Sequence, residues 1–153
     1  MSKKDKEQDQ QCEFAGKVAT VIKCGDRRYS PLTREQVLSS LGIGDFYTLS
    51  RLGAGQQLLQ RNTRKQFLRE IRNTLRHGSS VIVVIHHEDC AMYDGSSAFR
   101  NYQEERTTQV AQLYQCAGIL LKKFPSTTVV LCWHPAPTRG PLEVVHIIRP
   151  SGE

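Results

Sequence analysis

The sequence predicts an α/β fold: a mostly parallel sheet flanked by helices, with an antiparallel edge strand from a C-terminal hairpin. Three observations carry this prediction. Continuous apolar runs at 18–22 and 80–85 are typical of parallel strands that helices cover on both faces. Segments with helical periodicity separate the strand-like segments. The last two strand-like segments are joined by a proline-rich connection that is too short for a crossover helix, which predicts an antiparallel pair.

The expected elements alternate along the chain. Strands are expected at 18–22, 45–50, 80–85, 127–133 and 142–148, and helices at 33–41, 63–77 and 99–124. The strand at 45–50 is rich in aromatic and β-branched residues. Thr33 and Gln36 have the spacing of a capping box, and Pro125 follows the last helix. The resulting order is β-α-β-α-β-α-β-β, without an internal repeat.

Length and composition are those of one globular domain. The chain has 153 residues, of which 39% are hydrophobic and 24% charged, enough for one core but not for two. We therefore expect a single domain over residues 13–153, after a disordered polar tail at residues 1–12. The tail lacks the apolar stretch of a secretory signal, and no segment reaches the ~20 apolar residues that span a bilayer. We expect a cytoplasmic protein without a membrane partner.

A stripe of basic residues marks the helix expected at 63–77. The stripe consists of Arg61, Lys65, Arg69, Arg72 and Arg76, whose spacing places them on one helix face. Such a stripe is usually a solvated surface, although it could attract an acidic partner or nucleic acid. No aromatic interleaving and no RNA-binding motif accompanies it, so nucleic acid is not favoured as a partner.

Residues with metal-binding chemistry follow two of the expected strands. The first strand runs into Cys24, and the strand at 80–85 runs into His86, His87 and then Cys90. Ligands of open α/β sheets bind beyond the carboxyl ends of the strands, so Cys24, His87 and Cys90 converge if these strands are neighbours. Two thiolates and an imidazole suit Zn²⁺ and leave the fourth tetrahedral position open, as in catalytic sites. His86 could replace His87, although the spacing to Cys90 favours His87.

Asp26 and Arg28 follow Cys24 at alternate positions. Alternate residues of an extended chain face the same side, so both side chains are expected beside Cys24. A guanidinium keeps a neighbouring carboxylate ionised and fixes its orientation. Such a carboxylate could accept a hydrogen bond from a zinc-bound hydroxide, or could itself occupy the open zinc position in an inactive state. A plain structural ion pair is the alternative.

The remaining cysteines and one further histidine have simpler interpretations. Five cysteines are an odd number for a disulfide framework. Cys12 is expected in the tail, whereas Cys116 and Cys132 fall on apolar faces and are expected in the core. His134 follows a strand end, so it could approach the same crevice or belong to the proline-rich turn.

The motifs Cys24-x-Asp26-x-Arg28 and His87-x-x-Cys90 together resemble the signature pair of the β-class carbonic anhydrases. The surroundings agree with this resemblance. Residues 41–45 resemble the Gly-Asp lead into the second strand of that family. Residues 51–55 resemble its Arg-Asn-Ala-Gly segment, where Gly53 is the clean match. The resemblance spans about residues 15–149.

The resemblance implies a carbonic anhydrase, a zinc-dependent lyase whose zinc-bound hydroxide converts carbon dioxide reversibly to bicarbonate. The implied zinc ligands are Cys24, His87 and Cys90, the implied catalytic residues are Asp26 and Arg28, and the implied substrate-binding residue is Gly53. The resemblance also implies a homodimer or a higher even oligomer.

The chain departs from the family pattern around the expected pocket. His86 and Ala91 stand where the family usually has glycine, and Arg51 and Leu52 stand where the Arg-Asn-Ala-Gly segment has Asn and Ala. These departures leave two alternatives open. One is a carbonyl sulfide or carbon disulfide hydrolase on the same scaffold, and the other is a non-catalytic zinc-binding regulatory protein.

Overall fold

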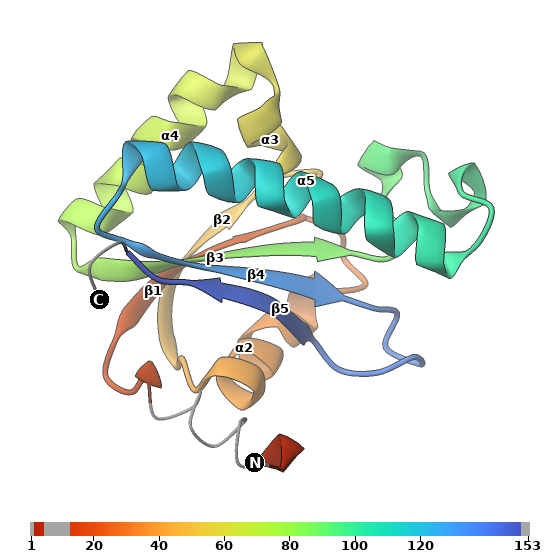
Figure 1. Cartoon of the computed structure of the whole chain (residues 1–153), viewed down its shortest axis with the longest axis horizontal. Coiled ribbons are helices and arrows are strands. Elements are labelled where there is room, and N and C mark those ends of the chain that lie inside the picture. The colour runs from red at the N-terminus through yellow and green to blue at the C-terminus, as the bar shows by residue number, and fades with distance from the viewer. Residues whose placement is uncertain (1, 5–12, 151–153) are drawn as a thin grey trace.

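One five-stranded sheet organises the chain, and it appears in a computed structural model that describes residues 2–4 and 13–150 (Figure 1). The strand order is β2-β1-β3-β4-β5. The strands are β1 (Val18–Lys23), β2 (Asp45–Ser50), β3 (Ser79–His87), β4 (Thr128–His134) and β5 (Glu143–Ile148). The first four run parallel, and β5 runs antiparallel to β4. The predicted α/β fold with an antiparallel edge strand is confirmed.

Helices cover both faces of the sheet. They are α2 (Thr33–Leu41), α3 (Gln56–Leu59), α4 (Arg61–Arg76) and α5 (Tyr102–Lys123). In Figure 1, α3, α4 and α5 lie on one side of the sheet and α2 lies on the other. The sequence did not predict α3, because a helix of four residues is too short to show periodicity. Among the helices that the structure describes, none is long and apolar enough to cross a membrane.

The two covered faces explain the continuous apolar run of β3. Its residues alternate between two hydrophobic clusters. Ile82 and Val84 pack with residues of α4 and α5, including Ile71 and Leu120. Val81, Val83 and Ile85 pack in the cluster that contains Val37 and Leu41 of α2. A strand buried on both faces cannot show polar alternation, which is why this segment indicated a parallel strand.

The start of α2 differs from the prediction. No side chain caps it, because a 3-10 turn at Ser30–Leu32 runs directly into the helix and Ser30 O already accepts from the Thr33 N–H. Thr33 Oγ1 donates to Tyr29 O, and Gln36 Oε1 accepts from the Leu142 N–H at 3.0 Å. The predicted capping box is therefore wrong, and Gln36 instead ties α2 to the start of β5.

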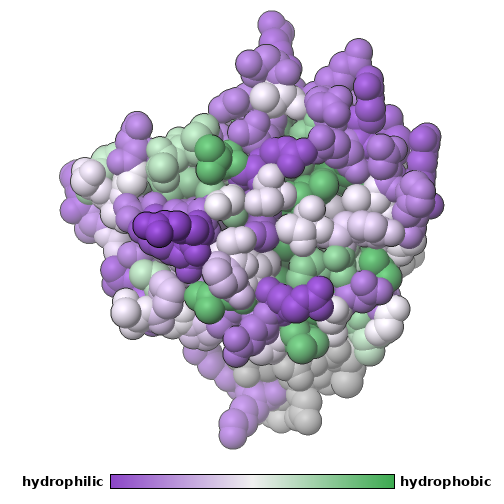
Figure 2. All heavy atoms as spheres, turned by 180° about the vertical axis from the view of Figure 1, so that it is seen from behind, coloured by the Kyte–Doolittle hydropathy of each residue, from purple (hydrophilic) through white to green (hydrophobic). Residues whose placement is uncertain are grey.

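The basic stripe lies on the outer surface of α4, as predicted. All five of its members are exposed, while Phe67, Leu68 and Ile71 of the same helix are buried. Hydrophilic side chains cover this part of the surface in Figure 2, which shows the molecule from behind. None of the five forms a salt bridge with a residue that the structure describes. This arrangement agrees with a solvated face.

The parallel register brings two strand ends together. Ile22 of β1 is paired with Val84 of β3, and His87 of β3 is paired with His134 of β4. The carboxyl ends of β1, β3 and β4 therefore meet at one edge of the molecule. The strand β3 extends through both His86 and His87, two residues beyond the predicted end.

Candidate metal centre

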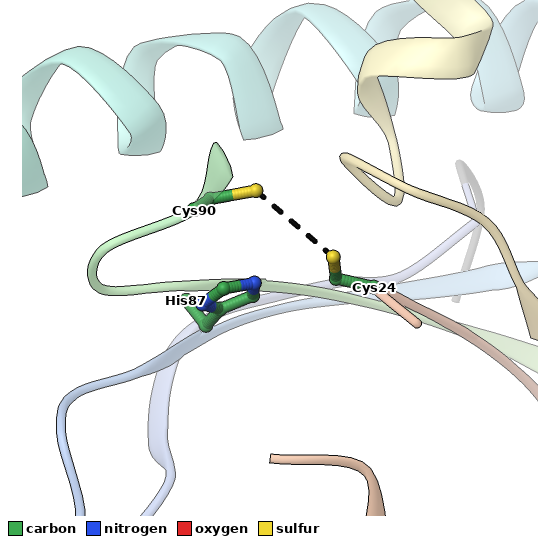
Figure 3. Close-up of side chains that lie close together, drawn as sticks. All are labelled: Cys24, His87 and Cys90. Carbon is green, nitrogen blue, oxygen red and sulfur yellow. Dashed lines mark hydrogen bonds between the residues drawn. The ribbon is translucent and has the colours of Figure 1, made fainter. Parts of the chain in front are cut away.

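Cys24, His87 and Cys90 meet at the carboxyl ends of β1 and β3. Their potential ligand atoms all lie within 4.8 Å of one another, and the three side chains point toward one another in Figure 3. The two sulfur atoms are 4.0 Å apart, too far for a disulfide, in which they are about 2.05 Å apart. All three residues are buried, with exposed fractions of 6%, 3% and 2% in chain order.

The imidazole of His87 is oriented as a metal ligand would be. Its Nδ1 lies 2.7 Å from the backbone oxygen of Glu88, which fixes Nδ1 as the donor nitrogen. Its Nε2 is buried and has no hydrogen-bond partner among the residues that the structure describes. Histidine ligands usually carry such a backbone acceptor on the other nitrogen. Tetrahedral zinc with Zn–S bonds of about 2.3 Å places two sulfurs about 3.8 Å apart. The three residues fit a metal ion.

Tyr29 and Gln109 hold the strand end that carries His87. The Tyr29 ring lies 4.3 Å from the His87 ring, and its hydroxyl donates to Glu88 O at 2.8 Å. Glu88 O therefore accepts from both side chains. From the other side, Gln109 Nε2 donates to the backbone oxygen of His87 at 2.9 Å. These contacts leave the imidazole little rotational freedom.

The sulfur of Cys24 accepts hydrogen bonds from its surroundings. The Cys90 thiol and the Gly53 N–H, at 3.5 Å, both face it, so the pKa of Cys24 is lowered and the pKa of Cys90 is raised. Of the two thiols, Cys24 is therefore the one that ionises more readily. Gly53 has φ +78°, and a Cβ on it would lie 3.0 Å from the Met92 Cβ. A residue with a side chain would be strained at this position.

Asp26 and Arg28 form the expected pair by a different route. The strand β1 ends at Lys23, and the chain then turns, so the alternation expected of an extended segment is wrong. The Arg28 N–H donates to Asp26 Oδ1 at 2.9 Å, and the guanidinium reaches back to Asp26 Oδ2 at 2.7 Å. These bonds lower the pKa of Asp26 to about 2. Asp26 itself is not a member of the three-residue cluster.

His86 points away from this cluster. Adjacent residues of a strand face opposite sides, and the ring of His86 lies 5.9 Å from the ring of Tyr93. Burial lowers the pKa of His86 to about 4. Of the two candidate histidines, the structure therefore brings His87 to the cysteines.

Cys116, Cys132 and His134 lie outside the three-residue cluster. Cys116 and Cys132 are fully buried in the hydrophobic clusters, as expected. His134 is the last residue of β4 and not part of the turn, and its ring lies 4.9 Å from that of Tyr29. Cys12 and most of the predicted tail at 1–12 lie outside the described residues.

The sequence analysis missed Tyr29, Asp89, Glu105 and Gln109. A signal for the last two was present, because the apolar stripe of α5 continues backward through these buried polar positions. Polar residues on a buried helix face indicate specific partners. Tyr29 and Asp89 carried no such signal, since their contacts depend on tertiary structure.

Two hollows on the surface have volumes of about 280 and 400 Å³. The first is lined by residues that include Arg51 and Glu70, and the second by residues that include Leu75 and Phe124. Neither is lined by Cys24, His87 or Cys90.

Comparison with known proteins agrees with this geometry. A family model described as “Putative carbonic anhydrase” matches residues 14–139. A solved structure of one of two tetrameric β-carbonic anhydrases from the filamentous ascomycete Sordaria macrospora superimposes with a TM-score of 0.56. The identity is 14%, over 90% of this chain and 85% of that chain, so this likeness concerns the fold. Among curated proteins, none matches this sequence.

Proposed function

The chain belongs to the family described as “Putative carbonic anhydrase”, and we propose that it is a zinc-dependent enzyme that hydrates carbon dioxide reversibly to bicarbonate. One observation carries the proposal. Among the described residues the His87 Nε2 is buried without a hydrogen-bond partner, and it lies within 4.8 Å of two free thiol sulfurs. This donor set suits zinc and leaves a fourth position for a water.

Each site residue has a distinct proposed role. Cys24, His87 and Cys90 would hold the zinc. A zinc ion held by these residues would supply a nucleophile derived from water at neutral pH, because zinc lowers the pKa of water from 15.7 to about 7. Asp26 would accept a hydrogen bond from that nucleophile and orient its lone pair toward the carbon of the substrate. Arg28 would act through Asp26, by keeping it ionised and oriented.

The surroundings of the cluster support a dry reaction site. The three proposed ligands are almost fully buried, which excludes bulk water and strengthens electrostatic interactions. Gly53 would border the substrate, and its N–H would also stabilise the Cys24 thiolate. Hydration of carbon dioxide releases one proton for each bicarbonate formed, and that proton has to reach the buffer.

We also propose that the chain forms a homodimer or a higher even oligomer. Leu38, Tyr47 and Leu52 are large hydrophobic residues with exposed fractions of 51%, 40% and 58%. Tyr47 belongs to the edge strand β2, and Leu52 follows that strand closely. A second copy over this edge would cover apolar surface and an open strand edge. Light scattering should give at least about twice the chain mass of 17.3 kDa, and a monomer would contradict the proposal.

Stopped-flow hydration of carbon dioxide tests the proposed activity. The zinc-loaded parent should exceed the buffer background, and Asp26→Ala should be slower by about tenfold or more, because the nucleophile loses its acceptor. Zinc content measured on the same samples should be equal in both proteins. A parent that binds zinc and shows no activity would contradict the proposal and support a non-catalytic zinc-binding protein.

A further inference from the structure

We propose that Asp89 is a positioning residue that holds Arg28 from a second side and thereby fixes Asp26. Its effect on catalysis rests on the proposed function, whereas its effect on Arg28 can be measured separately. Asp89 directly precedes Cys90, in the loop after β3. Neither the Asp26–Arg28 pair nor the three-residue cluster includes it.

Arg28 makes contacts on two separate loops. Within its own loop, Arg28 Nε donates to Asp26 Oδ1 at 3.1 Å, and Arg28 Nη2 donates to Asp26 Oδ2 at 2.7 Å. Toward the β3 loop, Nη1 donates to Asp89 Oδ2 at 2.7 Å and Nη2 donates to Asp89 O at 2.8 Å. The guanidinium is thus held by two carboxylates at once. Such charge-assisted bonds have fixed geometry as well as strength.

The Asp26–Arg28 pair needs a contact outside its own turn if Asp26 is to keep a fixed position. Asp26 and Arg28 are two residues apart in one turn, so their mutual bonds alone would let the pair move as a unit with that turn. The Arg28 side chain is 48% exposed, and a free arginine has about 2 kcal/mol of rotamer entropy. Asp89 joins the turn to the loop that carries Cys90. The Asp26 carboxylate is thereby placed relative to both strand ends.

Asp89 is itself firmly anchored. Its Oδ1 accepts from the Ser96 N–H at 2.7 Å, and its own N–H donates to Glu105 Oε2 at 2.8 Å. Glu105 lies on α5, is 1% exposed and also accepts from Ser96 Oγ at 2.9 Å. A buried carboxylate from a helix therefore fixes the loop from which Asp89 reaches Arg28. The chain of contacts runs from α5 through Asp89 and Arg28 to Asp26.

Asp89→Asn is the variant that separates this role from loop folding. Asn can keep the acceptor for the Ser96 N–H, and it tolerates the backbone angle φ +60° of Asp89. It then presents an NH₂ group to the guanidinium, which has only donors. Asp94→Asn is the matched control. Asp94 lies in the same loop region with φ +61°, is exposed, and has no salt bridge with a described residue.

The first readout is hydrogen exchange at Arg28 Nε, followed by NMR on the zinc-loaded full chain. The signal is assigned by its loss in Arg28→Lys. Nε donates to Asp26, so its exchange reports how firmly the Asp26–Arg28 pair is held. Asp89→Asn removes the acceptor of Nη1 and should accelerate exchange at Nε by about tenfold, the order of magnitude of one hydrogen bond between charged groups, whereas Asp94→Asn should leave it unchanged. Equal exchange in the two variants would overturn the proposal, whatever the enzyme does.

The second readout is kcat/KM for carbon dioxide with zinc content measured in parallel. Asp89→Asn should lower kcat/KM about threefold or more at unchanged zinc, and it should have no further effect in an Arg28→Ala background. A loss of equal size in both backgrounds would show that Asp89 does not act through Arg28. An inactive parent would defeat the proposed function, and the exchange measurement would still decide the role of Asp89.

Discussion

The interior of the sheet and the carboxyl ends of its strands both bury cysteines, but the cysteines have different neighbours in the two places. Cys116 and Cys132 pack among apolar side chains in the two hydrophobic clusters. Cys24 and Cys90 belong to the same cluster as Cys116 and are nearly as buried, yet they also face each other and an imidazole. Burial alone therefore does not distinguish an inert thiol from a proposed metal ligand. The position relative to the end of a parallel strand does.

The electrostatic surroundings show the same contrast. In the interior, Cys116 donates to Gly55 O at 3.1 Å, and burial raises its pKa to about 12. Burial also raises the pKa of Cys132. At the strand end, the donors around Cys24 outweigh burial and lower its pKa. The pKa of Cys90 is raised, by its hydrogen bond with Cys24 and by burial. The two regions therefore differ at Cys24, whose surroundings favour the thiolate, the form that binds metals.

The largest expected difference between the two regions is in metal content. The parent should carry about one zinc per chain, and Cys24→Ser or Cys90→Ser should lose most of it, because each removes a soft ligand. Cys116→Ser is the control, since its hydroxyl can still donate to Gly55 O. Elemental analysis that finds equal zinc in all four proteins would refute the assignment of the strand-end cysteines.

A substitution in the interior should give the opposite result. Leu120→Ala truncates a fully buried side chain of the larger cluster. The free energy of unfolding, measured with urea, should fall by about 2–5 kcal/mol, from lost burial and the cavity left behind. Zinc per folded chain should not change. A loss of zinc from the folded variant would show that the two regions are not independent.

Tyr29→Phe should weaken the strand-end site without removing a ligand. The variant keeps the ring beside His87 and loses the hydroxyl that donates to Glu88 O. Removing a hydrogen bond that orients a metal-binding histidine lowers metal affinity by about tenfold or more, and competition with a chromogenic chelator would measure the loss. Tyr114→Phe removes an exposed hydroxyl near His146 and serves as the control. Equal affinities in both variants would exclude a role for the Tyr29 hydroxyl.

The smallest effect is expected at the start of α5. Asn101 Oδ1 accepts from the Glu104 N–H at 2.9 Å and so caps the helix that carries Glu105 and Gln109. Asn101→Ala should cost about 1 kcal/mol of stability in thermal or urea unfolding, and Asn101→Asp should retain it. A larger loss, accompanied by loss of zinc, would mean that the cap supports the strand-end site through α5.

Much of the fold could be predicted because strand and helix signals were strong. The apolar run at 80–85 indicated a strand buried on both faces, and the structure extends it only at its ends. Convergence of Cys24 with Cys90 followed from parallel neighbours, a single assumption that β1 and β3 satisfy. Asp26 and Arg28 pair as expected, but through a turn that the alternating pattern did not indicate.

The remaining features depend on contacts between distant segments. Asp89 meets Arg28 across 61 positions of sequence, and no local pattern encodes such a pair. The spacing to Cys90 favoured His87 over His86, and the structure brings His87 to the cysteines, whereas the end of β3, which apolar periodicity leaves uncertain by a residue or two, was not predicted. Because β3 includes both His86 and His87, their side chains face opposite sides of the sheet, and only His87 lies beside the cysteines.

X-ray absorption at the zinc edge tests the central claim most directly. The Cys24, His87 and Cys90 site should give two sulfur ligands at about 2.3 Å and two nitrogen or oxygen ligands at about 2.0–2.1 Å. One of the lighter ligands should show the multiple scattering of an imidazole, and that scattering should disappear in His87→Ala. A first shell of four sulfurs, or a shell without sulfur, would contradict an open centre built from two cysteines and one histidine.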